Sequence, residues 1–412
     1  MSGAAAATLL VPSEARAADP CQAAPLVSTC VNSDTLWPHA GAQTFATVGG
    51  VDTVEPGRFG FGLVTDYLSR PIVLNVPSGS GGTAQYAVDN QVNGTFLWAV
   101  GITRRLELDL ALPITFGQDG SGAGAVTGNG STLHTTAIRD LRFGLALQLL
   151  PHAREDRDHG FGLTARAEIS APMGDRDQFA GDATAVFAPS LAADYRAGRF
   201  FAGLELGARI RPNTDEQSVQ GDSVGTQGTV ALGVGYDLLK RTHLLSVMAE
   251  ARSLPTFATQ FDIMQTPGGT VLTPNGTVLA PSEWMVSVRS APLVTDDLSI
   301  TLGGGGPIGS GQEAFTSPRF RFFLGLRFAP TGQVRRGAPV ALGLSAKTDR
   351  CKDDPDSADG FRDDDGCPDE DSDKDGIDDR YDRCPLQAED FVGLSDGCPE
   401  SPAAPKAPDD KK

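Results

Sequence analysis

Apolar and polar residues alternate with a period of two through most of the chain between residues 58 and 328. From Leu106 to Leu112 the leucines fall on one face, while Glu107 and Asp109 fall on the other. A period of two is that of a β-strand, whose successive side chains point to opposite sides. The pattern predicts about twelve strands. They are expected to begin near residues 58, 92, 105, 138, 160, 185, 199, 226, 242, 283, 297 and 318.

The connections between these strands alternate between long and short. Long connections are expected near residues 75–90, 117–136, 173–184, 211–225, 255–282 and 306–317. Outer-membrane barrels show this arrangement, with tight periplasmic turns and long external loops, whereas a soluble two-sheet sandwich has no reason for it. The sequence therefore predicts an all-β fold, an antiparallel transmembrane β-barrel over residues 57–329. Because the first long loop follows the first strand, both termini are expected in the periplasm.

The polar faces of the predicted strands carry charges of both signs. A charge that faces lipid costs about 2–4 kcal/mol at the bilayer midplane, so these side chains are expected in the barrel lumen. The expected lumen residues are Glu107, Asp109, Asp140, Arg142, Arg166, Glu168, Glu205, Arg209, Arg319 and Arg321. Two interpretations are open: ion-paired side chains that fill a narrow lumen, or a charged pore for small solutes. The mixture of acids and bases favours the first.

Both ends of the chain indicate export from the cytoplasm. Residues 4–11 form a short apolar run and Ala15 and Ala17 offer small side chains to a signal peptidase, so residues 1–17 are expected to be a signal peptide. A flexible alanine-rich terminus is the alternative. The six cysteines lie only in the terminal segments, which suggests disulfides made in an oxidising compartment. The expected pairs are Cys21–Cys30, in a periplasmic segment over residues 18–56, and Cys351–Cys367 and Cys384–Cys398 in the tail.

The tail carries the most specific motif of the chain. Between Asp371 and Asp382, carboxylates occupy positions 1, 3, 5, 9 and 12 and glycine occupies position 6, which is the spacing of a calcium loop. The expected calcium ligands are Asp371, Asp373, Asp375, Asp379, Asp382 and the carbonyl oxygen of Ile377. Asp359, Asp363 and Asp365 are candidates for a second calcium site. A solvated acidic linker is the alternative.

With Cys384-Pro385 included, residues 371–385 match every position of the pattern DxDxDGxxDxxDxCP and resemble a thrombospondin type 3 repeat. The segment Arg319–Phe328 resembles the terminal strand of bacterial outer-membrane barrels, which ends on an aromatic residue. The combination resembles OmpA-family proteins that join a barrel to calcium-binding repeats. This resemblance implies a periplasmic or cell-wall partner for the tail. After Pro399 only a short stretch rich in proline, alanine and lysine follows, so that family's peptidoglycan-binding domain is not expected.

The charge is concentrated in the tail. The chain has a net charge of -18, and from Asp349 onward 22 acidic residues stand against 9 basic ones. This acidity excludes a nucleic-acid partner, which needs a basic face. The expected partners are outer-membrane lipid, calcium ions and the partner of the tail. The layout after the barrel is a linker at 330–348, disulfide- and calcium-stabilised repeats at 349–400, and a disordered tail at 401–412.

Three functions are compatible with these features. A structural outer-membrane barrel with a periplasmic calcium-binding spacer is favoured. A channel for small solutes and a secreted, soluble, calcium-dependent adhesion protein are the alternatives. The chain has no HExxH or P-loop sequence, and no histidine is followed two residues later by serine, so an enzyme is not expected.

Overall fold

The protein divides into two compact units, residues 1–339 and residues 340–412. The computed structural model describes residues 21–24, 27–76, 83–124, 133–152, 159–212, 218–219, 222–238, 245–266, 269–290, 297–309, 317–331 and 384. The account of the fold therefore concerns the first unit. Among the described residues, no helix is long and apolar enough to cross a membrane.

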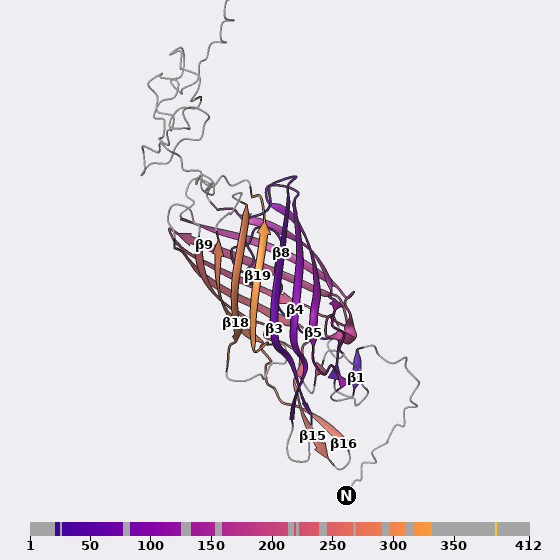
Figure 1. Cartoon of the computed structure of the whole chain (residues 1–412). Coiled ribbons are helices and arrows are strands. Elements are labelled where there is room, and N and C mark those ends of the chain that lie inside the picture. The colour runs from indigo at the N-terminus through magenta and orange to yellow at the C-terminus, as the bar shows by residue number, and fades with distance from the viewer. Residues whose placement is uncertain are drawn as a thin grey trace, which may run out of the picture. The chain divides into compact units, whose positions relative to one another are not determined.

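Twelve strands form the wall of a closed barrel (Figure 1). They are β3 (Phe59–Val76), β4 (Thr83–Gly101), β5 (Leu106–Asp119), β7 (Leu141–Leu150), β8 (His159–Ala171), β9 (Val186–Ala197), β10 (Phe200–Arg209), β13 (Gln227–Asp237), β14 (Leu245–Ser253), β17 (Ser282–Ser290), β18 (Leu298–Pro307) and β19 (Phe320–Phe328). Each strand pairs antiparallel with its neighbours, and β19 pairs with β3 to close the sheet. The expected all-β, antiparallel barrel of twelve strands is confirmed.

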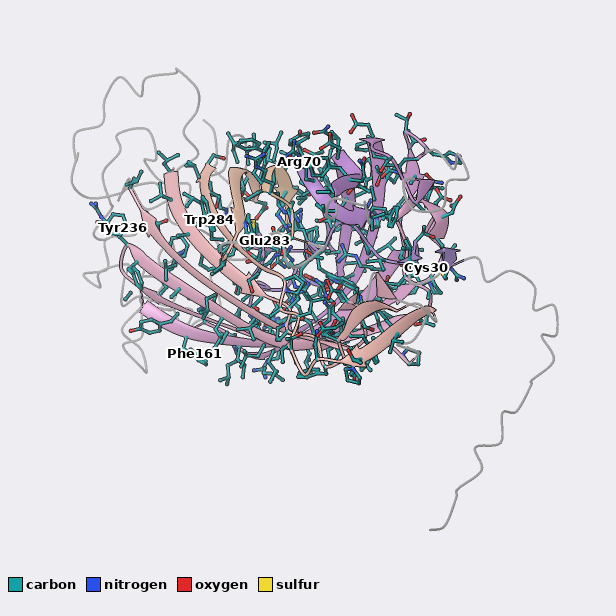
Figure 2. The ribbon with its side chains drawn as sticks, turned by 90° about the horizontal axis from the view of Figure 1, so that it is seen from below. Cys30, Arg70, Phe161, Tyr236, Glu283 and Trp284 are labelled. Carbon is teal, nitrogen blue, oxygen red and sulfur yellow. A yellow bond between two sulfur atoms is a disulfide. The ribbon has the colours of Figure 1, made fainter. Side chains whose placement is uncertain are left out.

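The alternation of side chains gives the barrel an apolar outer surface. Phe161, Tyr236 and Trp284 point away from the wall, whereas Glu283, the neighbour of Trp284, points inward and is buried (Figure 2). Large apolar side chains are exposed in the same way on every wall strand except β14, where the exposed residue is Ala249. A continuous apolar belt of this kind is stable against lipid and unfavourable against water. The wall is therefore that of an outer-membrane type of barrel.

The first two wall strands are longer than expected. β4 begins at Thr83 rather than near residue 92, because Thr83–Val88 pairs with the end of β3. A bulge at Arg70, whose φ is 54°, separates this extension of β3 from its wall portion. The expected long connection at 75–90 is therefore largely strand. Beyond the bulge, Ile72 and Leu74 are fully buried and pack in a cluster with Val31 and Phe179.

The barrel has one end with long connections and one with short turns. The long-loop end carries the extensions of β3 and β4 and several small elements, among which the β15–β16 hairpin projects from the wall (Figure 1). These small elements are β1 (Gln22–Ala24), β2 (Val27–Ser28), β6 (Ala137–Ile138), η1 (Arg176–Gln178), β11 (Ser218–Val219), β12 (Asp222–Ser223), β15 (Phe261–Thr266) and β16 (Gly269–Pro274). The short-turn end carries the connections β4–β5, β7–β8, β9–β10, β13–β14 and β17–β18.

The N-terminal segment does not lie where the sequence suggested. Cys21 and Cys30 form the expected disulfide, but β2 pairs with β11 at the long-loop end. The chain then crosses the inside of the barrel and meets the short-turn end near Thr53, which donates to the Arg104 carbonyl at 3.3 Å. The expected periplasmic segment 18–56 is thus corrected: residues 33–54 lie within the barrel. Residues 21–31 and Phe328 lie at opposite ends of the barrel, while residues 1–20 and the end of the chain lie outside the described residues, so the periplasmic placement of both termini stays a prediction.

Candidate functional site

Residues 33–54, which we call the lumen plug, have no helix or strand and run through the barrel from end to end. At the long-loop end, the Ser33 amide donates to the Phe179 carbonyl at 3.0 Å. Gly41 has a φ of +71°, and a Cβ there would lie 2.2 Å from a Glu107 oxygen. Only glycine allows the plug backbone to approach the wall this closely. The plug is therefore fitted to the wall at specific residues.

Inward carboxylates of the wall accept hydrogen bonds from backbone amides of the plug. Glu250 accepts from the Ala46 amide at 3.0 Å and from the Thr47 amide at 2.8 Å. Glu205 accepts from the Gly49 amide at 2.6 Å, and Glu107 accepts from the Val54 amide at 2.5 Å. A backbone without secondary structure needs such partners, because a buried, unpaired amide is costly.

Inward arginines of the wall supply the complementary donors. The acceptors are carbonyl oxygens of Thr35, Pro38, His39 and Gly50 in the plug. The donor arginines and their N–O distances are Arg252 at 2.6 Å and Arg209 at 3.0 Å to Thr35, Arg142 at 3.2 Å to Pro38, Arg327 at 2.6 Å to His39, and Arg166 at 3.0 Å to Gly50. A peptide backbone presents both donors and acceptors. The acidic and basic side chains of the wall therefore bind the amides and carbonyls of the plug backbone, in addition to forming ion pairs with one another.

Trp37 and His39 lie at the centre of these contacts. The Trp37 Nε1 donates to Glu168 Oε2 at 2.5 Å, and His39 Nδ1 lies 2.5 Å from the other oxygen of Glu168. The Cζ atoms of Arg142 and Arg209 each lie 4.6 Å from the centre of the Trp37 ring, which is cation–π distance. One plug side chain therefore engages strands β7, β8 and β10.

Arg321 joins three wall strands to the plug. It is fully buried, and its Nη1 contacts Asp34 of the plug at 2.8 Å and Asp66 of β3. Its Nε lies 3.0 Å from Glu283 of β17, which also pairs with Arg252 at 2.7 Å. A guanidinium group suits this position because its planar fork presents several donors at once.

The structure places the residues expected in the lumen as follows. Nine are buried and point inward: Glu107, Asp109, Asp140, Arg142, Arg166, Glu168, Glu205, Arg209 and Arg321. Arg319 is the exception, because it precedes β19 at the rim and is exposed. Asp140 lies before β7 and accepts from the amides of Gly174 and Asp182, which orders the β8–β9 connection.

The plug residues, above all Trp37 and His39, were not predicted from the sequence. Apolar and polar residues do not alternate with a period of two in the plug, so the pattern that predicted the strands predicts nothing there. One signal was available: residues 33–54 contain two aspartates, Asp34 and Asp52, and no lysine or arginine. A segment of 22 residues with so little charge is suited to burial.

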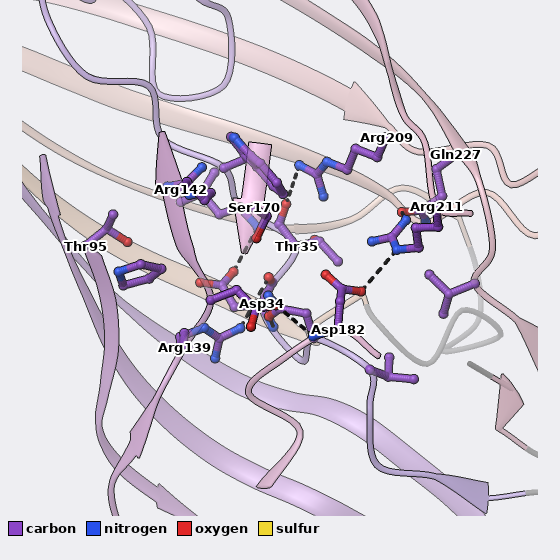
Figure 3. Close-up of a pocket in the computed structure, with 17 residues that line it drawn as sticks. Asp34, Thr35, Thr95, Arg139, Arg142, Ser170, Asp182, Arg209, Arg211 and Gln227 are labelled. Atoms are coloured by element: carbon purple, nitrogen blue, oxygen red, sulfur yellow. Dashed lines mark hydrogen bonds and ion pairs between the residues drawn. The ribbon is translucent and has the colours of Figure 1, made fainter. Parts of the chain in front are cut away.

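Two small cavities lie beside Trp37. One has a volume of about 30 Å³ and is lined by Arg139, Arg142, Asp182 and Arg211 among others (Figure 3). The other has a volume of about 40 Å³ and is lined by His39, Glu168 and Glu205 among others. Leu36, Trp37 and Arg209 line both. Each has room for a few water molecules and is too small for an organic solute.

No cluster of metal-ligating side chains occurs within the ranges that the structure describes. The expected calcium ligands Asp371, Asp373, Asp375, Ile377, Asp379 and Asp382, and the second set Asp359, Asp363 and Asp365, lie outside those ranges. So do Cys351, Cys367 and Cys398, while Cys384 is disulfide-bonded. The signal peptide at 1–17 and the assignments at 332–383 and 385–412 also lie outside. Calcium binding by the tail stays a prediction.

His152 ties the end of the plug to the wall and gives a testable pH dependence. It follows β7 and lies 3.4 Å from Asp52 of the plug and 2.7 Å from Asp194 of β9. Hydrogen bonds to Asp194 and Asp52 raise the pKa of His152 to about 10. Since an unfolded histidine titrates near pH ~6.5, this stabilisation is complete below that pH and is lost as the pH rises through about 10.

We therefore expect the unfolding temperature of the protein to fall between about pH 8 and about pH 11 more steeply than that of a His152→Gln variant. The variant is the control for every other group that titrates in this range. Thermal unfolding in detergent, followed by circular dichroism, measures both curves. Parallel curves would mean that the His152 ion pairs do not stabilise the plugged barrel.

Comparison with known proteins gives one family and a set of solved barrels. A family model described as a putative MetA-pathway of phenol degradation matches residues 75–250, which run from the end of β3 into β14. A search of the curated proteins finds no match.

The chain is similar to several solved structures. An outer membrane channel from Pseudomonas putida F1 is 15% identical with a TM-score of 0.44, and the match covers 68% of this chain and 98% of that one. The NanC porin is 7% identical with a TM-score of 0.36, covering 65% and 98%. A deletion mutant of the TodX monoaromatic hydrocarbon channel is 10% identical with a TM-score of 0.33, covering 66% and 89%. None of these three concerns OmpA proteins or thrombospondin repeats, so that resemblance stays a prediction.

Proposed function

We propose that this protein is a channel of the bacterial outer membrane for small solutes and that the lumen plug is its gate. One observation carries the proposal: a separate chain segment, residues 33–54, runs through the lumen and occupies the space that the ion-paired wall side chains leave. Barrel diameter grows with strand number, and side chains alone fill a barrel of about eight strands. A barrel of twelve strands leaves a conduit unless something else occupies it.

The contacts of the plug suit a segment that can be exchanged for water. They are mostly hydrogen bonds between wall charges and plug backbone, such as Arg166 to the Gly50 carbonyl and Glu205 to the Gly49 amide. Water can replace such bonds when the plug leaves, and each bond to a charged group contributes about 1.5–3 kcal/mol net. Apolar contacts also anchor the plug at three places along its length. Phe45 clusters with Phe201, Leu36 with Phe323, and Val54 with Leu97.

The family description, which names phenol degradation, favours small aromatic compounds as the solutes. This supports the channel over the structural barrel that the sequence alone favoured. The apolar belt argues against a secreted, soluble adhesion protein, because such a belt would lie in water. Calcium binding by the tail is a separate proposal that rests on the spacing of Asp371 to Asp382.

Conductance across planar lipid bilayers tests the channel. We expect deletion of residues 33–50 to raise single-channel conductance by roughly ten-fold, because a polar lumen is left open to water. Deletion of the β15–β16 hairpin, residues 261–274, is the matched control and should leave conductance unchanged, since the plug stays in place. A plug-deleted protein that still shows the heat-modifiable gel mobility of a folded barrel, but does not conduct, would contradict the proposal.

A further inference from the structure

The surroundings of Trp37 contain three elements that recognise an aromatic ring with a hydrogen-bond donor. The guanidinium groups of Arg142 and Arg209 lie over the ring, each with Cζ 4.6 Å from its centre. The third element is the carboxylate of Glu168, which accepts from the ring N–H at 2.5 Å. These three side chains belong to the wall, whereas Trp37 belongs to the plug.

Contacts other than those to the Trp37 side chain also hold the three wall residues, most of them to neighbouring plug residues that a substitution of Trp37 leaves in place. Glu168 contacts His39 Nδ1 at 2.5 Å and lies 3.8 Å from Arg142 Nη1. Arg142 donates from Nη2 to the Pro38 carbonyl, while its Nη1 is buried without a hydrogen bond. Arg209 is bound to the Thr35 carbonyl at 3.0 Å (Figure 3). An arginine nitrogen left without a hydrogen bond beside the ring is a donor still available to a ligand.

The space around the ring extends beyond the indole. The cavities of about 30 and about 40 Å³ are both lined by Leu36, Trp37 and Arg209. Removal of the Trp37 side chain would therefore join them to the volume of the indole itself. The combined space exceeds that of a single benzene ring with one or two small substituents.

We propose that Trp37 occupies the binding site of the transported solute, and that this solute is a small aromatic ring bearing a hydroxyl group. The inference rests on the proposed channel function and names the solute class for the same lumen. In the bound state the ring lies against the guanidinium groups of Arg142 and Arg209, and the hydroxyl donates to Glu168 in place of the Trp37 N–H. The solute and the plug compete for one site, so solute binding favours release of the plug.

The chemistry separates this solute class from its neighbours. An aromatic hydrocarbon keeps the cation–π contacts but leaves the Glu168 carboxylate without its donor. A cyclic alcohol supplies the donor and lacks the π face. An aromatic carboxylate can pair with Arg142, but it lacks the donor that Glu168 accepts and places a second negative charge beside that carboxylate.

Calorimetric titration of the full chain in detergent tests the inference. We expect phenol to bind a Trp37→Ala variant saturably and at least about ten-fold more tightly than it binds the unchanged protein, because the competing indole is gone. Benzene and cyclohexanol should each bind the variant at least about ten-fold more weakly than phenol, since each loses one element. Should Trp37→Ala fail to assemble, Trp37→Ser gives the same comparison with a side chain suited to a wet lumen.

A Trp284→Ala variant is the matched control. Trp284 lies on the lipid-facing side of β17, where detergent covers the barrel. Its replacement should leave the affinity for phenol equal to that of the unchanged protein, and any change would reveal phenol taken up by the detergent. Equal binding of phenol, benzene and cyclohexanol to Trp37→Ala, tighter binding of benzoate than of phenol, or no saturable binding would each overturn the inference.

The inference and the channel function fail in different ways. A plug-deleted barrel that conducts, together with a Trp37→Ala variant that does not bind phenol, removes the solute site and leaves the channel. A Trp37→Ala variant that binds phenol, together with a plug-deleted barrel that does not conduct, removes the channel and leaves an aromatic-binding site.

Discussion

Replacement of Arg321 by alanine should lower the free energy of unfolding of the barrel by about 3–5 kcal/mol, since removal of one partner leaves buried charges unpaired. The carboxylates of Asp34 and Asp66 lose their shared partner, and Glu283 keeps only Arg252. All of these groups are buried. Urea unfolding of the protein reconstituted in lipid vesicles, followed by tryptophan fluorescence, measures the loss.

Arg319→Ala is the matched control. Arg319 and Arg321 are two residues apart and were both expected in the lumen, but Arg319 is exposed at the rim. Its replacement should change stability by no more than about 0.5 kcal/mol. Arg321→Lys should fall between the two variants, because lysine keeps the charge and loses the planar fork. Equal losses for Arg319→Ala and Arg321→Ala would mean that the buried junction does not stabilise the barrel.

A charge in the middle of the apolar belt should have the second large effect. Leu232 lies at the centre of β13, between Leu204 of β10 and Ala251 of β14, with 53% of its surface exposed. Leu232→Arg should cost about 2–4 kcal/mol, because the arginine lies in the lipid core near its midplane. The same vesicle unfolding experiment measures this cost, and the yield of heat-modifiable protein reports on assembly.

The depth dependence distinguishes a lipid belt from an ordinary apolar surface. Phe59 also points outward, but it is the first residue of β3 at the short-turn end. Phe59→Arg should cost only about 0–1 kcal/mol, because arginine near the interface reaches polar headgroups. If Leu232→Arg and Phe59→Arg cost the same, the assignment of the outer surface to the lipid core is wrong.

The sequence by itself determined the wall. Strict alternation identifies a strand and its faces together, because neighbouring side chains of a strand point to opposite sides. Glu107 and Asp109 are buried while Leu108 between them is exposed, as the alternation predicts. The limits of β4 were misjudged because Thr83–Val88 pairs beyond the barrel rim, where no bilayer imposes alternation.

The tertiary structure alone decided what fills the lumen. The plug is defined by contacts between residues far apart in the chain, such as Trp37 with Glu168 and Thr35 with Glu283. No local pattern encodes such contacts, because a segment without secondary structure has no period to detect. The same reason explains Arg319: alternation specifies the direction of a side chain, and only the closed barrel specifies where the wall ends. The inward charges were thus evident from the sequence, while their partner, a backbone segment crossing the lumen, became evident only when the wall had closed around it.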